Sequence, residues 1–77
     1  MKQIVYHPKT DRISVFIRHF APSRLGAASK VYKWLLSRST PIECELVYLR
    51  TNRQGLGYWL TFTIEGGSAE ERRRVLA

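Results

Sequence analysis

The sequence predicts an α+β fold, a four-stranded and mostly antiparallel sheet with one main helix on one face. Residues 58 to 65 alternate apolar and polar side chains, which is the pattern of a half-buried strand. Residues 24 to 38 instead space their apolar side chains with a helical period. Strand-like stretches also come in two pairs, each followed by a helical stretch, which gives the order ββαββα. At 77 residues the chain forms one domain, residues 1–77.

The first pair of strands is predicted over Ile4 to Tyr6 and Arg12 to Phe20. Pro8 and Asp11 lie in the intervening segment and favour a turn. If Tyr6 faces Ile13, the two alternations agree and place their apolar side chains on one face, which supports a hairpin. The opposite face, called here the outer face, would carry Val5, His7, Arg12, Ser14, Phe16 and Arg18, with Phe20 as a further candidate.

The main helix is predicted from Arg24 to Arg38, with Ser23 as its N-cap. The residue before Pro41 disfavours helical backbone, so the helix should end before it. The apolar stripe would comprise Leu25, Ala28, Val31, Tyr32, Leu35 and Leu36. Lys30, Lys33 and Ser37 would lie opposite, with Trp34 and Arg38 at the flank.

The second hairpin is predicted from strands at Ile42 to Arg50 and Tyr58 to Glu65, joined by a flexible glycine-containing loop over residues 51–57. Ser68 and Glu71 have the spacing of a capping box, so a short helix should follow from Glu70 to Ala77. The inward face of the third strand would hold Ile42, Cys44, Leu46 and Tyr48, and its outward face Glu43, Glu45, Val47 and Leu49. The predicted core includes Val15, Leu35, Leu46, Leu60 and Phe62.

The charge balance is the strongest global signal. Thirteen Lys and Arg against six Asp and Glu give a net charge of +7 and a pI near 10.2. Such an excess on a small domain favours a polyanion or an acidic protein surface as partner. The single cysteine, Cys44, fits a reducing compartment, and no apolar run reaches the ~20 residues of a membrane span. We therefore expect a cytoplasmic protein without a membrane partner.

The outer face is the first candidate site. Aromatic rings beside guanidinium groups can stack unpaired bases while the cations hold phosphates, as on the sheets of RRM domains. The strand order and the Lys/Arg-Gly-aromatic motif of RRM domains are absent, however. Coverage of this face by the C-terminal helix, or by a second copy in a homodimer, is the competing interpretation. The residues concerned are Phe16, Phe20, Val47, Leu49 and Trp59, with Arg12 and Arg18 among them.

A distributed set of cations is the second candidate site. Arginine matches phosphates or carboxylates with two parallel hydrogen bonds, and lysine adds point charge. The alternative is an ordinary solvated charged surface. The set comprises Lys30, Lys33, Arg38, Arg50, Arg53, Arg72, Arg73 and Arg74.

Catalytic, cofactor and metal sites are not expected. Glu43, Glu45 and Glu65 could approach one another, but strand glutamates are ordinary surface residues, and no Asp or His has a suitable spacing. His7 and His19 have no evident partner for acid–base chemistry, and Cys44 falls on the inward face. The segment from Gly55 to Gly57 matches no phosphate-binding fingerprint.

Two functions remain open. The first is a non-enzymatic protein that binds RNA or DNA through phosphate contacts and an aromatic sheet face. The second is an interaction module or inhibitor that covers an acidic surface of a nucleic-acid-handling complex. Small cofactor-free proteins of phages and mobile elements, including anti-CRISPR proteins, often act in this second way, which is an analogy of class alone.

Overall fold

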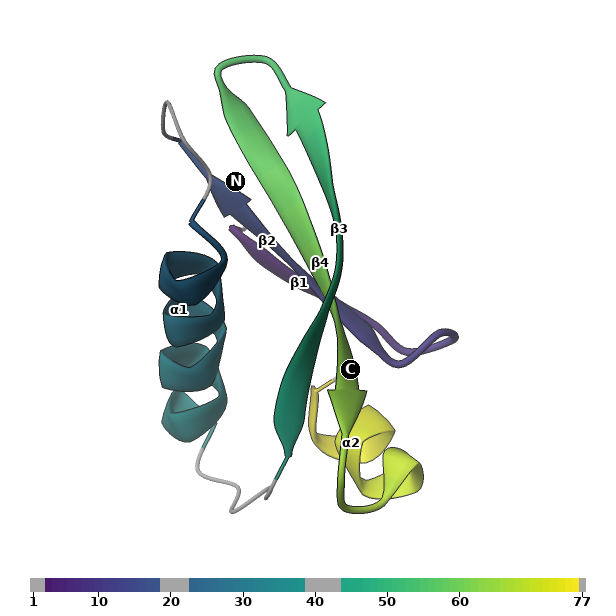
Figure 1. Cartoon of the computed structure of the whole chain (residues 1–77). Coiled ribbons are helices and arrows are strands. Elements are labelled where there is room, and N and C mark those ends of the chain that lie inside the picture. The colour runs from purple at the N-terminus through teal and green to yellow at the C-terminus, as the bar shows by residue number, and fades with distance from the viewer. Residues whose placement is uncertain (1–2, 19–22, 39–43, 77) are drawn as a thin grey trace.

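The computed structural model describes residues 3–18, 23–38 and 44–76. Its order confirms the ββαββα prediction, and the four strands form one antiparallel sheet in the order β1-β2-β4-β3 (Figure 1). Predictions that concern His19, Phe20, Pro41, Ile42, Glu43 and Ala77 fall outside the described residues. The elements are β1 (Ile4–His7), β2 (Arg12–Ile17), α1 (Arg24–Ser37), β3 (Glu45–Gln54), β4 (Gly57–Glu65) and α2 (Ala69–Leu76).

The register of the first hairpin is confirmed. Ile4 pairs with Val15 and Tyr6 with Ile13, so the side chains of both pairs point towards the helix. Strand β4 lies inside the sheet, where Leu60 pairs with Val15 of β2. Val15, Leu60 and Ile13 are fully buried, because each lies on the apolar side of a strand that has neighbours or a helix against it.

Helix α1 begins as predicted but is rotated from the predicted face. The Ser23 hydroxyl accepts a hydrogen bond of 3.1 Å from the Gly26 N–H, which confirms the N-cap. The buried residues are Ala27, Val31 and Leu35. The predicted stripe is wrong at three positions, because the side chains of Leu25, Tyr32 and Leu36 are exposed, at 85%, 38% and 80%. The small Ala27 permits close approach to the sheet, so a narrow row with i, i+4, i+8 spacing makes the contact.

Strand β3 is longer than predicted at its C-terminal end. It continues to Gln54 and joins β4 through the two residues Gly55 and Leu56, so the predicted loop over 51–57 is wrong. Polar residues 51–54 suggested a loop, but their backbone pairs with residues 57–60 of β4, and tertiary pairing overrides composition. A register shift between Tyr48 and Arg50 leaves Leu49 without its own partner, which is a β-bulge.

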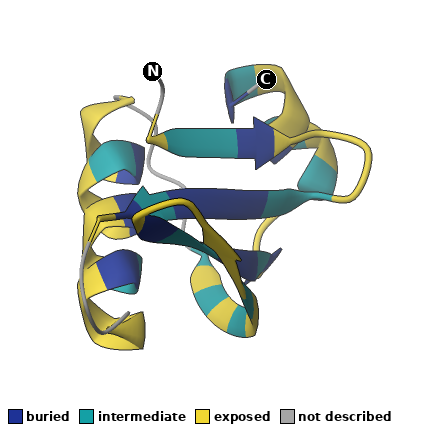
Figure 2. Ribbon diagram, turned by 90° about the horizontal axis from the view of Figure 1, so that it is seen from above, coloured by how far each residue is buried: buried dark blue, intermediate teal, exposed yellow. Residues whose placement is uncertain are grey.

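Helix α2 packs on the same side of the sheet as α1. Leu76 is 3% exposed and belongs to the core cluster that contains Tyr6 and Ile13, whose side chains point to that side. Viewed from above, α1 and α2 lie near opposite ends of β1 and β2 (Figure 2). Neither described helix covers the outer face. Within the described residues, no helix is both long and apolar enough to cross a membrane.

Candidate nucleic-acid interface

The outer face brings together side chains from all four strands. In the observed registers, Phe16 pairs with Trp59 and Ser14 with Thr61, while Arg50 of β3 pairs with the same Thr61. The outer face consists of Val5 and His7 from β1, Arg12, Ser14 and Phe16 from β2, Trp59, Thr61, Thr63 and Glu65 from β4, and Glu45, Val47, Arg50 and Asn52 from β3.

An aromatic pair marks one end of the outer face. The rings of Phe16 and Trp59 lie 5.3 Å apart at 59°, a tilted packing, and both residues are half-buried. The Trp59 indole N–H donates to the Gln54 side-chain oxygen, which fixes the ring orientation. A side chain at Gly57 would clash with the Phe16 ring and lie 2.7 Å from the Ile17 carbonyl oxygen. Glycine is therefore required where the ring crosses β4.

A hollow of about 340 Å³ adjoins these rings, and Arg18 lines it together with Phe16 and Trp59. A volume of this size can hold one flat ring system beside the aromatic pair. The predicted combination of Phe16, Arg18 and Trp59 is thus assembled in space.

A chain of polar side chains occupies the centre of the outer face. The His7 Nε2 atom lies 3.1 Å from the Ser14 hydroxyl, which lies 3.0 Å from the Thr61 hydroxyl. Ser14 and Thr61 are each 7% exposed, whereas His7 is exposed. The pairing of His7 with Ser14 was missed in the sequence, although the hairpin register implies it. That register sets Val5 opposite Ser14, so His7 is a diagonal neighbour of Ser14.

Cations surround this polar chain. Two further hollows of about 420 and 540 Å³ share His7, Ser14, Arg50 and Thr61. No Asp or Glu lines either hollow, and the charged residues that do are Lys9, Arg12, Arg50 and Arg53. The centre of the outer face is therefore a polar chain of exposed His7 with buried Ser14 and Thr61, and the Lys and Arg side chains around it give the surface a positive potential.

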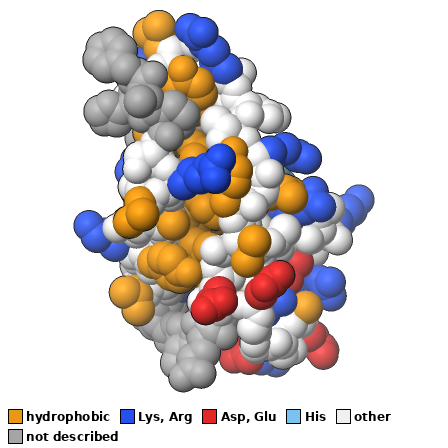
Figure 3. Space-filling view, in the orientation of Figure 1, with side chains coloured by type: hydrophobic (Ala, Val, Ile, Leu, Met, Phe, Trp, Pro, Cys, Tyr) orange, Lys and Arg blue, Asp and Glu red, His pale blue; other side chains and the backbone are white. Residues whose placement is uncertain are grey.

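Two acidic side chains, Glu45 and Glu65, lie at one end of the outer face. Glu45 and Glu65 are direct cross-strand partners at the outer end of β3 and β4. In Figure 3 the Asp and Glu side chains gather in the lower part of the view, and the Lys and Arg side chains extend above and around them. Within the described part of the chain, no three His, Cys, Asp or Glu side chains are grouped to hold a metal ion.

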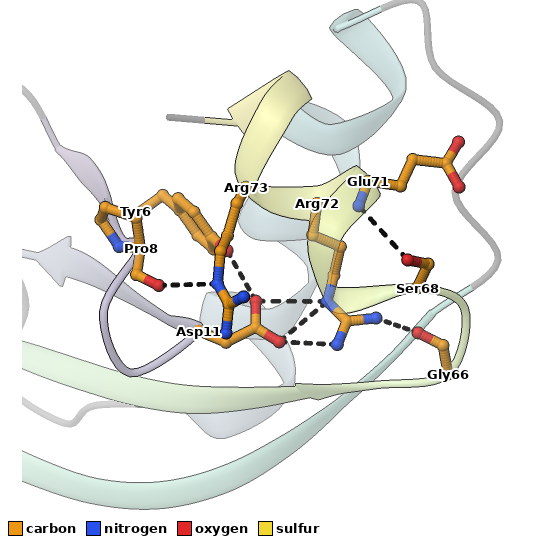
Figure 4. A network of polar contacts seen from close by, with 8 residues as sticks. All are labelled: Tyr6, Pro8, Asp11, Gly66, Ser68, Glu71, Arg72 and Arg73. Atoms are coloured by element: carbon orange, nitrogen blue, oxygen red, sulfur yellow. Dashed lines mark hydrogen bonds and ion pairs between the residues drawn. The ribbon is translucent and has the colours of Figure 1, made fainter.

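Arg72, one of the predicted binding residues, lies in a buried ion pair rather than on an open surface. Its side chain is 7% exposed and forms an ion pair of 2.6 Å with the Asp11 carboxylate, which also accepts from its Nε atom (Figure 4). Arg72 donates further to the Gly66 carbonyl, and the Tyr6 hydroxyl donates to Asp11 at 2.7 Å. This network anchors α2 to the turn between β1 and β2.

The network shifts the pKa of two acids in opposite directions. Burial alone would raise the pKa of Asp11, but the hydrogen bonds from Arg72 and Tyr6 outweigh it and lower the pKa. For Tyr6, burial and the hydrogen bond to Asp11 act together and raise the pKa to about 12. Both shifts describe a structural ion pair, and neither places a proton donor or acceptor on the outer face.

The remaining predicted cations separate into two groups. Arg50 and Arg53 lie on β3 beside the outer-face hollows. On α1, Lys30 donates to the Gln3 side chain at 2.9 Å, and the Arg38 guanidinium lies 4.6 Å from the Trp34 ring centre. The structure leaves Lys33 of α1 and Arg74 of α2 exposed, and Arg73 donates to the Pro8 carbonyl. The predicted set is therefore two surfaces on opposite sides of the sheet.

Comparison with protein-family models, curated proteins and solved structures finds no match to this chain.

Proposed function

We propose that the protein binds single-stranded RNA or DNA on the outer face, without catalysis. The observation that carries the proposal is the union of an aromatic pair with three arginines, Arg12, Arg18 and Arg50, on the side of the sheet that neither described helix covers. Unpaired bases stack on aromatic rings, and phosphates accept hydrogen bonds from guanidinium groups and hydroxyls. The free thiol of Cys44 fits action in the cytoplasm.

Charge argues for a polyanion rather than a second copy on this face. A two-fold dimer through the outer face would set the same arginines of both protomers against each other. Like charges brought together in an interface oppose association. A nucleic-acid strand instead supplies the opposite charge along its whole length. An acidic protein surface would also supply that charge, but it would leave the stacking surface of Trp59 without a function.

The test is a titration of labelled single-stranded oligonucleotides, with a matched duplex, at two salt concentrations around 0.15 M. Trp59→Leu should weaken binding by about 5- to 150-fold, since stacking contributes about 1–3 kcal/mol per base. Arg50→Gln should reduce the slope of log affinity against log salt by about 0.7. The matched control is Arg74→Gln, which removes the same charge from α2.

Equal losses in Arg50→Gln and Arg74→Gln would contradict the proposal, since net charge alone would then explain the binding. Loss of oligonucleotide binding near 0.15 M salt would also contradict the proposal, and it would favour an acidic protein as the partner. Circular dichroism of each variant establishes that it is folded. Sedimentation of the wild type and Trp59→Leu without ligand measures self-association through the outer face.

A further inference from the structure

Strand β1 leaves one edge of its backbone without a partner. The Phe16 N–H donates to the Gln3 carbonyl at 2.7 Å, so Gln3 and Phe16 form a hydrogen-bonded pair. Hydrogen-bonded pairs alternate along an antiparallel ladder, so the N–H and C=O groups of Ile4 and Tyr6 point away from β2. Among the described residues, no backbone or side-chain group is bonded to them. Two donors and two acceptors are therefore available along this edge.

The opposite edge of the sheet is protected at two points. On β3 the Tyr32 hydroxyl accepts a hydrogen bond of 3.0 Å from the Leu46 N–H, and the bulge at Leu49 interrupts the ladder. Bulges and bonded groups of this kind prevent other strands from pairing with an edge. Strand β1 pairs with β2 in a continuous register, so its edge has no such protection.

A groove runs along the free edge of β1 on the side of the two helices. It has a volume of about 700 Å³, and its walls include Ile4 and Tyr6 of β1, Trp34 of α1 and Leu76 of α2. In Figure 2, β1 is the outermost strand in the upper part of the view, with α1 beside one end and α2 beside the other. A strand added to this edge would point alternate side chains into an apolar groove.

Positive charge borders the groove on both helices. Arg38 is part of the wall, where its guanidinium packs against Trp34. Lys30 donates to Gln3, and Arg73 donates to the Pro8 carbonyl at 3.2 Å, and both acceptor residues line the groove. No Asp or Glu lines it.

We propose that the free edge of β1 binds an extended acidic segment of a partner protein as a fifth strand. The backbone of the segment would pair with Ile4 and Tyr6, which is β-strand addition. Its alternate apolar side chains would occupy the groove, and flanking Asp or Glu side chains would face Lys30, Arg38 and Arg73. A second copy of this chain fits less well, because pairing β1 with β1 would bring the cations of both copies together.

The probe is a fluorescent peptide of alternating leucine and glutamate, tested with the full-length protein. A peptide with lysine in place of glutamate tests the charge requirement, and a backbone-N-methylated peptide tests the strand pairing. We expect saturable binding of the glutamate peptide alone. In the NMR spectrum of the protein, the backbone amide signals of Ile4 and Tyr6 should shift when the glutamate peptide is added. The indole N–H signal of Trp59 should not shift. Equal binding of the lysine or N-methylated peptide would overturn the proposal.

Two substitutions test the site on the protein. Ile4→Pro removes an N–H that the fold does not use, so it should weaken peptide binding at least about tenfold while the domain stays folded. Arg38→Gln should weaken binding by up to about fivefold, and Lys33→Gln, an exposed charge on the same helix, should leave it unchanged. If Ile4→Pro does not fold, the comparison of peptide affinity between Arg38→Gln and Lys33→Gln tests the site instead. Equal effects of these two variants, or displacement of the peptide by single-stranded DNA, would refute the site.

Discussion

At the scale of single residues, Asp11 has the largest structural role of any acid in the described chain. Its backbone adopts a positive φ of 55°, and its carboxylate accepts hydrogen bonds from the Tyr6 hydroxyl and the Arg72 guanidinium. A turn residue could be expected at this position from the sequence, since aspartate tolerates this backbone region. No signal in the sequence indicates that Arg72, 61 positions away, is the partner.

Asp11→Asn should destabilise the fold by about 3–5 kcal/mol, because it leaves the buried Arg72 guanidinium without its counter-charge. Urea unfolding of the variant beside the wild type measures the loss. Asp11→Asn combined with Arg72→Met should recover part of it, since no unpaired charge then remains buried. An Asp11→Asn variant as stable as the wild type would show that the ion pair contributes nothing net.

The pH dependence of stability follows from the lowered pKa of Asp11. Its stabilising effect is fully present above the unfolded pKa of about 3.9 and is lost as pH falls through the lower folded pKa. The raised pKa of Tyr6 acts at the other limit: its contribution is present below about pH 10 and is lost as pH rises towards about 12. Unfolding curves should show both losses in the wild type. Asp11→Asn should flatten the acid limb, and Tyr6→Phe the alkaline limb.

At the scale of elements, alternation and capping were sufficient to predict the number and order of the strands and both helices, but not the extension of β3 over residues 51–54. They were insufficient for the rotation of α1, because Leu25 and Leu36 fit a broad helical stripe as well as Ala27 does. The position of Arg50 was also missed, since strict alternation would put it on the inward face. The bulge at Leu49 adds one residue and moves Arg50 to the outer face. Bulges have no reliable signature in a single sequence.

Leu60 on the interior strand β4 and Leu25 on the exposed side of α1 should respond very differently to replacement by alanine. Leu60→Ala removes a fully buried side chain and should cost about 2–5 kcal/mol, enough to unfold much of the protein. Leu25→Ala changes a side chain that is 85% exposed, so the free energy of unfolding should move by no more than about 0.5 kcal/mol. Thermal unfolding of the two variants compares them directly, and similar midpoints would contradict the assigned faces.

The aromatic pair depends on a glycine in the neighbouring element. Gly57→Ala should displace the Phe16 ring and destabilise β4 by about 1–3 kcal/mol, because the new methyl group overpacks a filled site. Gly55→Ala is the matched control: its methyl group would meet no atom within 4 Å, and only its backbone conformation is strained. Trp59 fluorescence should therefore change in Gly57→Ala and stay the same in Gly55→Ala.

At the scale of the whole molecule, the excess of positive charge acts on stability as well as on binding. Self-repulsion of seven net charges opposes the compact state, and salt screens it. We expect the thermal midpoint to rise by a few degrees between low salt and about 0.15 M chloride. A Lys33→Gln, Arg74→Gln double variant should respond less. A midpoint that falls with salt would show that attractive surface pairs dominate.

The pairing of β2 with β4 also determines how the protein can fold. Each hairpin closes a short loop of chain. The contact between Ile13 and Phe62, in contrast, closes a loop of about fifty residues. A lone hairpin is marginal in water, so neither half should persist by itself. Docking of the two halves is then the slow step, and contacts across this seam set the folding rate. On the ribosome, β1, β2 and α1 have no complete surface to pack against until β4 has been synthesised.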